Sequence, residues 1–371
     1  MKITTIGIDL AKIVFQIHGV DERGKAAVRK QLKRAEMSSY FANLEPCLIG
    51  MGTCGSAHHR ARKLEGYGHT VKLMAPQFVK PYVKTNKNDI TDAEAICEAA
   101  SRPNMRFVAK KTVEQQAILS VHRARQGFVK ARTAQGNQIR GLLSEFGIVI
   151  PQGIGAIAKR VPEILEDGDN GLPGMMRNLL ERLTENLKEM DRQAKELETL
   201  IQLWHRENEA SRKLAEIPGL GPITASAIMA TVGDARGERS EGLKNGRQLA
   251  AWMGLVPKQN SSGGKQNQLG ISKRSDTYLR TLMIHGARAV IRFAENKAEP
   301  ESWLRKLMAR RNKNVAAVAL VKQLAIPLSN QNTVAKWLVM ANKNARIVWA
   351  LLANDRTFRP DYTPAAVVAG M

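Results

Sequence analysis

Two aspartates three positions apart, Asp89 and Asp92, stand where a polar loop gives way to a strongly helix-forming segment. On a helix this spacing places both carboxylates on one face, about one turn apart. Ala93, Ile96 and Ala99 supply an apolar stripe, so the segment predicts an amphipathic helix. Acids in a first turn also favour the positive end of the helix dipole and can cap it, so a purely structural role remains open.

A third acid, Asp9, ends a β-rich run near the start of the chain. The segments that follow predict further strands at residues 14–20, 26–28, 47–51 and 69–74, with helices at 30–44 and 58–64. Three strands, a helix, a strand, a helix, a strand and a helix is the order expected of an RNase H-like α/β domain. Acids at the ends of its first and fourth strands and on a late helix converge at one sheet edge. Asp9 and the Asp89/Asp92 pair fit two of these places, whereas the fourth-strand place, residues 51–53, has no acid.

The chain is strongly basic, with 57 Lys+Arg against 34 Asp+Glu and a formal net charge of +23. That excess predicts a polyanionic partner, of which nucleic acid is the commonest, with a membrane surface as the competing interpretation. No stretch approaches the roughly 20 apolar residues of a spanning helix. The first residues read as a strand rather than a signal peptide, and three scattered cysteines indicate neither a disulfide framework nor a zinc site. A reducing cytoplasm is the expected compartment.

The region from residue 102 to 140 predicts a long amphipathic helix with a basic face and a single acid, Glu114. Its expected apolar positions are Val113, Ala117, Val121, Ala124, Phe128 and Ala131. A solvated face is the ordinary interpretation of charged residues, but charge of one sign repels itself unless an anion neutralises it. We therefore expect a nucleic-acid surface that includes Arg123, Arg125, Lys130, Arg132 and Arg140.

Residues 147–174 carry several glycines and prolines and predict a linker or hairpin. Beyond them, apolar residues step by four and three over about three heptads, which is typical of a coiled coil. With the basic helix, this segment predicts an antiparallel helical hairpin that either packs on itself or dimerises. The seam consists of Leu183, Leu187, Met190, Ala194, Leu197, Ile201 and Trp204.

Two loops in the C-terminal half have the composition of phosphate-binding segments. Gly219 and Gly221, before an alanine-rich helix, resemble the loop of a helix-hairpin-helix element, although an ordinary turn before a core helix is the alternative. In the second loop Ser262 is followed by two glycines and framed by basic residues, so a hydroxyl can approach a phosphate; a phosphate-contacting loop without chemistry is the alternative. Its basic residues are Lys265, Lys273 and Arg274. Basic helices are expected at 278–294, 302–309 and 315–324, with a tail after about residue 357.

Carboxylates clustered at a sheet edge in a basic protein predict Mg²⁺ held by oxygen ligands. Two such ions roughly 4 Å apart stabilise the attacking and leaving oxygens of a phosphodiester displacement. The alternative nucleophile is a serine, which would give a covalent DNA ester that keeps the bond energy for rejoining. His58 and His59 near Cys54 form a short cluster without distant partners, for which we favour a structural or substrate-facing role.

In this order, the pieces resemble the DEDD-type insertion-sequence transposases related to the Piv DNA invertases, over most of the chain. The resemblance is carried by GIDLAK (7–12), CGSAHHRAR (54–62), LMAPQFVKPYVKTNKNDITDAEAI (73–96), IPGLGPITA (217–225) and LAAWMGLVPKQNSSGGKQNQLGISKRSDTYLRTLMIHGARA (249–289). It implies a RuvC-like nuclease domain, a coiled-coil insertion and a mostly helical C-terminal transposase domain. It also implies Mg²⁺-dependent DNA recombination by a homo-oligomer (a dimer or tetramer), guided by a non-coding bridge RNA.

Carried over by position, the resemblance makes Asp9, Asp89 and Asp92 the first, third and fourth acids of the DEDD set, and Ser262 the nucleophile, with Ser261 as its neighbour. It implies that the acids of one subunit meet the serine of another through a phosphoserine–DNA intermediate. The family's Glu falls at Gly52 here. Competing hypotheses are therefore a catalytically impaired DNA- or RNA-binding regulator on a decayed nuclease fold, and a Holliday-junction endonuclease, which would not need Ser262.

These patterns predict three parts: a nuclease domain over residues 1–110, a basic helix and coiled-coil region over 111–210, and a transposase domain with the serine loop over 211–371.

Overall fold

The computed structural model describes residues 2–84, 86, 88–217, 219–232, 248, 251–274, 276–297, 308–310 and 316. The chain divides into two compact units, one of residues 1–115 with 232–371 and the other of residues 116–231. The three-part division expected from the sequence stays a prediction. The helices expected at 302–309 and 315–324 and the tail after residue 357 lie almost entirely outside the described residues.

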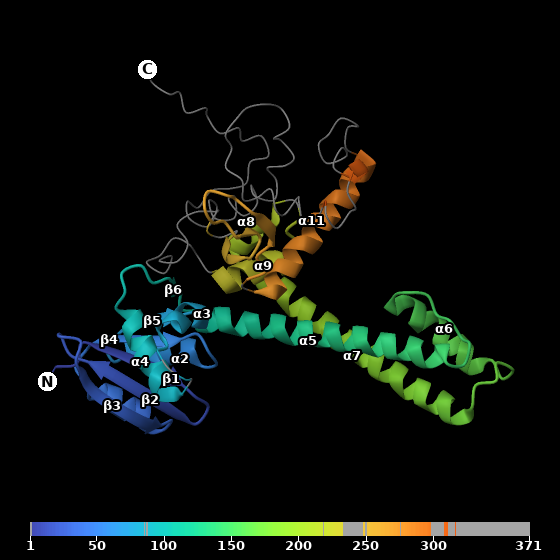
Figure 1. The fold of residues 1–371 in the computed structure, drawn as a ribbon. Coiled ribbons are helices and arrows are strands. Elements are labelled where there is room, and N and C mark those ends of the chain that lie inside the picture. Colours follow the sequence, from blue (N-terminus) through green and yellow to red (C-terminus); the bar gives the residue numbers. More distant parts are fainter. Residues whose placement is uncertain are drawn as a thin grey trace, which may run out of the picture. The chain divides into compact units, whose positions relative to one another are not determined.

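The N-terminal part of the first unit is a mixed sheet of six strands covered by helices (Figure 1). The strand order is β3-β2-β1-β4-β5-β6. β1 pairs antiparallel with β2 and parallel with β4, and β4 pairs parallel with β5. The strands are β1 (Thr5–Leu10), β2 (Val14–Val20), β3 (Ala26–Lys33), β4 (Leu48–Gly52), β5 (Thr70–Met74) and β6 (Phe107–Val108). The helices are α1 (Glu36–Ala42), α2 (Ala57–Glu65), α3 (Pro76–Val79), the 3₁₀ helix η1 (Lys80–Tyr82) and α4 (Asp89–Ala100).

The order of the expected elements is confirmed, with a correction at β3, and three short elements that were not expected, α3, η1 and β6, are added. The helix expected from residue 30 begins only at Glu36, because residues 26–33 continue as a strand paired with β2. Only Leu32 of the last six residues of β3 is buried, as expected of an edge strand with one face in solvent. An edge strand of this kind, with Arg29, Lys30 and Lys33, has no clear period that would separate it from a helix.

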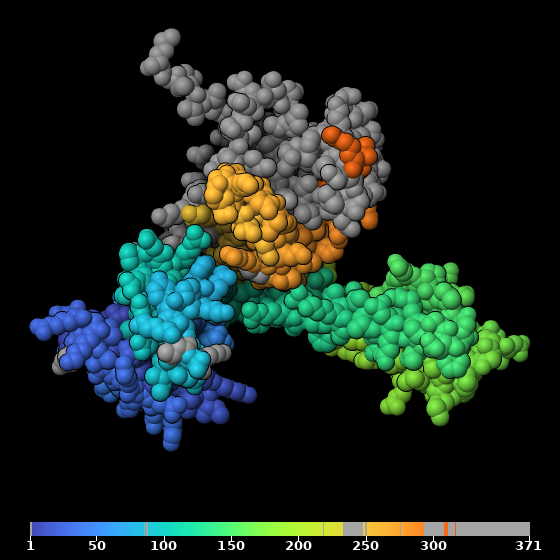
Figure 2. Space-filling view, viewed as in Figure 1, coloured from blue at the N-terminus to red at the C-terminus, as the bar shows by residue number. Residues whose placement is uncertain are grey.

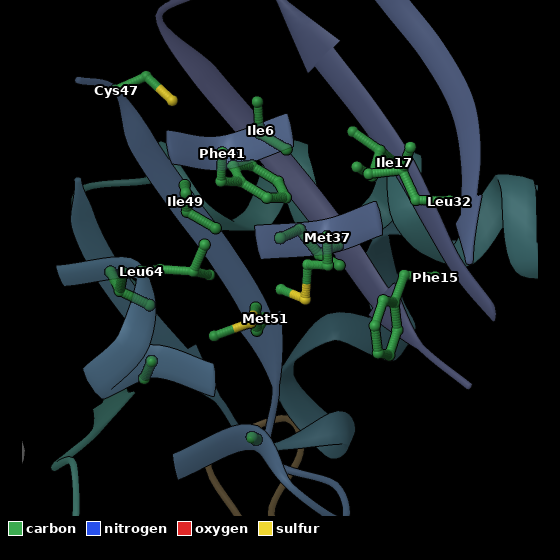
Figure 3. Packing of buried hydrophobic residues seen from close by; sticks show 14 of the residues in the cluster. Ile6, Phe15, Ile17, Leu32, Met37, Phe41, Cys47, Ile49, Met51 and Leu64 are labelled. Carbon is green, nitrogen blue, oxygen red and sulfur yellow. The ribbon is translucent and has the colours of Figure 1, made fainter. Parts of the chain in front are cut away.

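The sheet has a hydrophobic core on one face and α4 on the other. Phe15 and Ile49 of the strands pack with Met37 and Phe41 of α1 and Leu64 of α2 in one buried cluster (Figure 3). On the other face a second cluster joins the end of β5 with Ile96, Ala99 and Ala100 of α4. Burial on both faces explains why β1 and β4 are almost continuous apolar runs.

The second unit is built on two long helices that run antiparallel, α5 (Val113–Ser144) and α7 (Gly174–Glu207), with α6 (Ile154–Glu166) packed against α7 (Figure 1). Figure 2 shows the same green part of the chain with all its atoms. The expectation of a linker or hairpin over residues 147–174 is wrong, because 154–166 is a helix. Ile157, Val161 and Ile164 bury its apolar face, even though Pro162 lies inside it. Two shorter helices complete the unit, α8 (Glu209–Ala215) and α9 (Pro222–Val232).

The C-terminal part of the first unit contains a two-stranded hairpin and a long helix. β7 (Pro257–Gln259) pairs antiparallel with β8 (Gln268–Ile271), and α11 (Thr277–Lys297) covers the helix expected at 278–294. Asp276 caps α11, since its carboxylate accepts hydrogen bonds from the N–H groups of Tyr278 (2.7 Å) and Leu279 (3.2 Å). No helix among the described residues is long and apolar enough to cross a bilayer.

Candidate active site

The face of β1 that carries Asp9 is set by the glycine two residues before it. A Cβ on Gly7 would lie 2.2 Å from the Ala93 carbonyl oxygen and 2.4 Å from the Cys97 nitrogen, so α4 rests directly on this face of β1. Because side chains alternate along a strand, Asp9 faces the same side as Gly7. Asp9 is half-buried there, at the carboxyl end of the strand.

Position 52 lies beside Asp9 on the neighbouring strand. The parallel register pairs Gly7 with Gly50 and Ile8 with Met51, so the next position aligns Asp9 with Gly52. Gly50 also faces α4, since a Cβ there would lie 2.6 Å from the Ala100 Cβ. A Cβ on Gly52 would meet nothing within 4 Å, so a side chain at this position would extend into open space.

The first turn of α4 reaches the same end of the sheet. Thr5 accepts a sulfur hydrogen bond from Cys97 (3.6 Å), and Gly7 lies under Ala93, so α4 and β1 run in opposite directions. Asp9 is about 7 Å beyond Gly7 at the strand rise, and Asp89 is about 6 Å beyond Ala93 at the helix rise. Asp9, Asp89 and Asp92 therefore share one end and one face of the sheet, next to Gly52.

Neither acid in the first turn of α4 is the helix cap. Asn88 is the N-cap: its side chain accepts a hydrogen bond from the Thr91 N–H (2.8 Å), and its own N–H donates to the Thr91 hydroxyl (3.3 Å). This capping box satisfies the helix end without a carboxylate. Asp89 is exposed and Asp92 is half-buried. Capping therefore does not explain these two acids, although both still complement the helix dipole.

The carboxylate oxygens at this end of the sheet suit a hard divalent cation such as Mg²⁺. In the described part of the chain, however, no three His, Cys, Asp or Glu side chains stand close enough together to hold a metal ion, and this includes His58 and His59. His58 instead accepts a hydrogen bond from the Lys111 N–H through Nδ1 (3.2 Å). Desolvation, and secondarily the Asp9 carboxylate, raise the pKa of the nearby Cys54 thiol.

Ser262 stands at the tip of the β7–β8 hairpin. Its carbonyl oxygen accepts a hydrogen bond from the Lys265 N–H (3.0 Å), and Gly263 and Gly264 between them have φ of +54° and +77°. Two central residues at positive φ define a type I′ turn, which an L side chain would strain. Both serines are exposed, and the Ser261 hydroxyl accepts a hydrogen bond from the Asn267 N–H (3.3 Å).

The backbone around Lys273 and Arg274 closes tightly on a glycine. Lys273 has φ of +53° and donates its N–H to the Gly254 carbonyl (3.1 Å). A Cβ on Gly254 would lie 2.1 Å from the Arg274 carbonyl oxygen, which also accepts a hydrogen bond from the buried Arg280 (3.1 Å). The side chains of Lys265, Lys273 and Arg274 are exposed, so their predicted contact with nucleic acid is sterically open.

The basic residues predicted on α5 separate into two groups. Arg123 and Lys130 are exposed, whereas Arg125 and Arg132 are turned toward α7 and form ion pairs with Glu198 and Asp191. Arg140 is half-buried and donates to the Asn137 side chain (2.6 Å). The positive charge of Arg125 and Arg132 is thus already matched, and a nucleic-acid role for all five stays a prediction.

The apolar face expected for α5 is wrong at four of its six positions. Val113 is 69% exposed, and Ala117, Ala124 and Ala131 are also exposed, whereas Val121 and Phe128 are half-buried. The face turned inward carries Ile118, His122, Gly136, Ile139 and Leu143, with Arg125 and Arg132 on the same side. On α7, by contrast, every expected seam residue from Leu183 to Trp204 is buried or half-buried.

The segment with Gly219 and Gly221 connects α8 to α9. Gly219 has φ of +87°, and the Gly221 carbonyl accepts the first hydrogen bond of α9, from the Ala225 N–H (2.9 Å). Gly221 is exposed, whereas residues 224–230 of α9 are buried. Both the phosphate-binding loop and the ordinary turn before a core helix agree with this geometry, and the neighbouring Pro218 lies outside the described residues.

Both parts of the chain that carry these features match transposase family models. Residues 6–148 match the model of DEDD transposases of the IS110 type, described as "Transposase", and residues 211–301 match "Transposase IS116/IS110/IS902 family". The class of protein is therefore an insertion-sequence transposase, an enzyme that cleaves and recombines DNA.

Similar full-length proteins agree. The chain is 49% identical to a "Probable family 20 transposase" of Pseudomonas aeruginosa, over 97% of this chain and 100% of the relative. It is 42% identical to the transposase for insertion sequence element IS1111A of Coxiella burnetii, over 96% and 92% of the two chains. It is 40% identical to the transposase for insertion sequence element IS1328 of Yersinia enterocolitica, over 96% and 99%. The chain belongs to the IS116/IS110/IS902 family of transposases.

Proposed function

We propose that this chain is a DNA recombinase that works through a serine–DNA intermediate, with the carboxylates at the end of the sheet as its metal-binding half. The observation that carries the proposal is the alignment of Asp9 with the first turn of α4. Asp9, Asp89 and Asp92 share one face and one end of a sheet whose strand order is that of an RuvC-like nuclease. Because Asn88 caps α4, Asp89 and Asp92 are not needed as helix caps.

In this proposal Asp9, Asp89 and Asp92 would hold Mg²⁺. The cation would neutralise the carboxylates, which otherwise repel DNA, and would stabilise charge on the phosphodiester. In the described structure the three acids share a face without forming a ready cluster, so metal and DNA should bind together.

Ser262 supplies the nucleophile. The type I′ turn holds Ser262 at an exposed tip, and among the described residues no atom lies within 4 Å of a Cβ on Gly263 or Gly264. This leaves room there for a phosphodiester to approach. The Oγ–P bond forms as the bond from phosphorus to one deoxyribose oxygen breaks, and the departing oxygen takes up a proton. Attack by a deoxyribose hydroxyl of another strand on the same phosphorus then releases Ser262, so the phosphodiester energy is conserved.

The finer expectations from the sequence belong to the same proposal. A homo-oligomer would bring the acids of one subunit to the serine of another, and a bridge RNA from the element would choose the DNA partners. The α5–α7 pair, with its two ion pairs one heptad apart, is consistent with a coiled-coil insertion, and the α8–α9 connection with a helix-hairpin-helix-like element.

The test is recombination in vitro with the full chain, Mg²⁺, DNA carrying the element ends, target DNA, and RNA transcribed from the non-coding segment beside the gene. Recombinant junctions should appear only with metal and RNA, and Asp9→Asn or Asp92→Asn should abolish them. Glu114→Gln, on α5, is the matched control and should leave them unchanged. Junctions that survive in both aspartate variants would refute the metal-site assignment.

Gly52 motivates a second candidate function, that of a DNA- or RNA-binding regulator on a decayed nuclease fold. One of four carboxylates is missing at the place where the resemblance expects Glu. A regulator would bind the same DNA without cleaving it, at any concentration of Mg²⁺ or Mn²⁺. Product formation by the natural chain therefore separates the two candidates.

A further inference from the structure

Arg60 is a nearly buried cation that has no anionic partner among the described residues. Its residue is 7% exposed, and its Nε is a buried donor that makes no hydrogen bond. No ion pair joins Arg60 to a carboxylate in the part of the chain that the structure describes. Its guanidinium instead lies 5.2 Å from the centre of the Phe15 ring. Burying a charge that has only an aromatic ring beside it costs free energy, unless a bound ligand of opposite charge pairs with it.

Arg34 adds a second guanidinium to the same ring, 5.6 Å from its centre. Its Nε donates to the Lys12 carbonyl (3.2 Å), and its backbone N–H donates to the Ile13 carbonyl (3.1 Å), so the turn between β1 and β2 holds Arg34 in place. Burial, and secondarily the repulsion between these two cations, lowers the pKa of Arg60. An anion between them would remove that repulsion.

The surroundings are positive as well. The pKa of His59 is lowered first by partial burial and then by four cations, Arg60, Arg62, Lys63 and Arg34. In the part of the chain with described side chains, no carboxylate is among the groups that shift the pKa of His59 or of Arg60. This part of α2 therefore favours an anion in two ways: its positive charges attract it, and the Arg60 Nε offers it a hydrogen-bond donor.

The place of the two arginines in the fold indicates what the anion belongs to. Phe15 pairs with Leu10 in the register of β1 and β2, directly after Asp9. Since Leu10 and Asp9 face opposite sides of the sheet, the arginines lie at the same sheet end as the acids but on the face covered by α1 and α2. If a nucleic-acid strand crosses this end of the sheet to reach Asp9, the phosphates next to the reacting one would lie near the arginines.

We propose that Arg60 and Arg34 form a phosphate-binding site that holds the backbone of the nucleic acid at the end of the sheet where Asp9 lies, on the face opposite α4. Arginine suits this role because its planar fork can donate two parallel hydrogen bonds to phosphate oxygens. The inference deepens the proposed function and rests on it, because it assumes that nucleic acid crosses this end of the sheet. Both arginines are positioning residues, since they would touch a phosphate beside the one that reacts.

The test compares Arg34→Gln, Arg60→Gln and Arg60→Lys with Arg23→Gln in the full chain. Arg23 is exposed in the β2–β3 turn, at the other end of β2, and its variant loses the same charge. Affinity for fluorescent duplex DNA and for single-stranded RNA is measured over a series of salt concentrations. Each Gln variant at 34 or 60 should weaken binding about tenfold and reduce the slope of log affinity against log salt by about 0.9 for duplex. Arg23→Gln should leave both quantities unchanged.

A stability readout separates the site from a purely structural role. Replacing an unpaired buried cation should not destabilise the free protein. The melting temperature of Arg60→Met should therefore equal or exceed that of the natural chain, while the variant binds nucleic acid more weakly. Inorganic phosphate should raise the melting temperature of the natural chain and not that of Arg60→Met. If Arg60→Met melts lower and Arg34→Gln binds DNA and RNA normally, the arginines only pack on Phe15 and the inference is wrong.

The remaining outcomes are also decisive. If phosphate stabilises the natural chain through Arg60 but neither DNA nor RNA binding depends on Arg34 or Arg60, the site takes a free anion and its assignment to the nucleic-acid backbone is overturned. If the arginines govern binding although the natural chain makes no recombinant, the phosphate site stands and the proposed recombination fails instead.

Discussion

Gly7 and Ala93 are in direct contact across the interface between β1 and α4: a Cβ on Gly7 would lie 2.2 Å from the Ala93 carbonyl oxygen. This contact determines how near the first turn of α4 lies to the end of β1. It therefore also determines the placement of Asp89 and Asp92 relative to Asp9. The candidate site depends on the absence of a side chain two residues before its first acid.

Replacing Gly7 by Ala should destabilise the protein by about 3 kcal/mol, because backbone atoms of α4 cannot yield as a flexible side chain can. Urea unfolding followed by circular dichroism measures the loss. The matched control is Gly52→Ala, on the same face of the next strand, where a Cβ meets nothing within 4 Å and the change should be within about 0.5 kcal/mol. Equal effects of the two substitutions would contradict the packing of α4 on β1.

Gly52→Glu should raise Mg²⁺-dependent recombination at least tenfold. The substituted side chain enters open space beside Asp9 and adds a fourth carboxylate to the group at this end of the sheet. Junction formation in vitro, measured beside Gly52→Gln, separates the effect of charge from that of bulk. If the natural chain is already as active as the Glu variant, position 52 lies outside the metal site.

The ion pairs Arg125–Glu198 and Arg132–Asp191 lie seven residues apart on both α5 and α7, so they should fix the alignment of the two helices. Arg132→Glu alone should destabilise the second unit by about 3 kcal/mol, since it places two half-buried acids together. Adding Asp191→Arg should restore most of that stability. Unfolding of the two variants and the natural chain gives the coupling free energy, and a value near zero would show that the pair does not hold the register.

These arginines also show why α5 was the hardest element to predict. Its inward face carries Arg125, Arg132, His122 and Gly136, which do not register as apolar in a sequence pattern. Val113 and the alanines at 117, 124 and 131, which are exposed, gave a false period. Those arginines can face inward only because acids on α7, some sixty to seventy residues away in the chain, pair with their charges.

Other parts of the fold followed from local sequence alone. The strands around Asp9 and the helix at Asp89 were predictable because buried strands and helix caps have strong local patterns. The edge strand β3 and the proline-containing α6 were not, because their buried face becomes apparent only with their packing partners. For the candidate site, the sequence indicated the acids and the serine. It did not indicate the open space at Gly52 or the buried, unbonded Nε of Arg60, which depend on neighbours distant in the chain. The Asn88 cap is local, formed with Thr91, but the aspartates beside it offered a competing cap.

His122 should make the stability of the second unit depend on pH. Burial first, and then the charge of Arg125, lower its pKa to about 4, and its Nε2 lies 3.1 Å from the Ser226 hydroxyl. Between that value and the ordinary 6.5, the unfolded chain binds a proton that the folded chain does not. Stability should therefore be constant above about pH 6.5 and fall below it, by up to about 3 kcal/mol as pH reaches 4.

Urea unfolding of the natural chain and His122→Gln at a series of pH values isolates this contribution. Gln can still donate to Ser226 but does not titrate, so the variant should lose less stability between pH 6.5 and 4. Parallel curves for the two proteins would contradict the assignment of the pH dependence to His122.

The covalent intermediate is the most direct test of the account. Labelled DNA with the element ends is incubated with the full chain, Mg²⁺ and the flanking RNA, then denatured and separated by size, and the labelled peptide is identified by mass spectrometry. The account predicts DNA attached to Ser262, lost in Ser262→Ala and kept in Ser261→Ala. Recombination without any protein-bound DNA, or with full activity in Ser262→Ala, would contradict it.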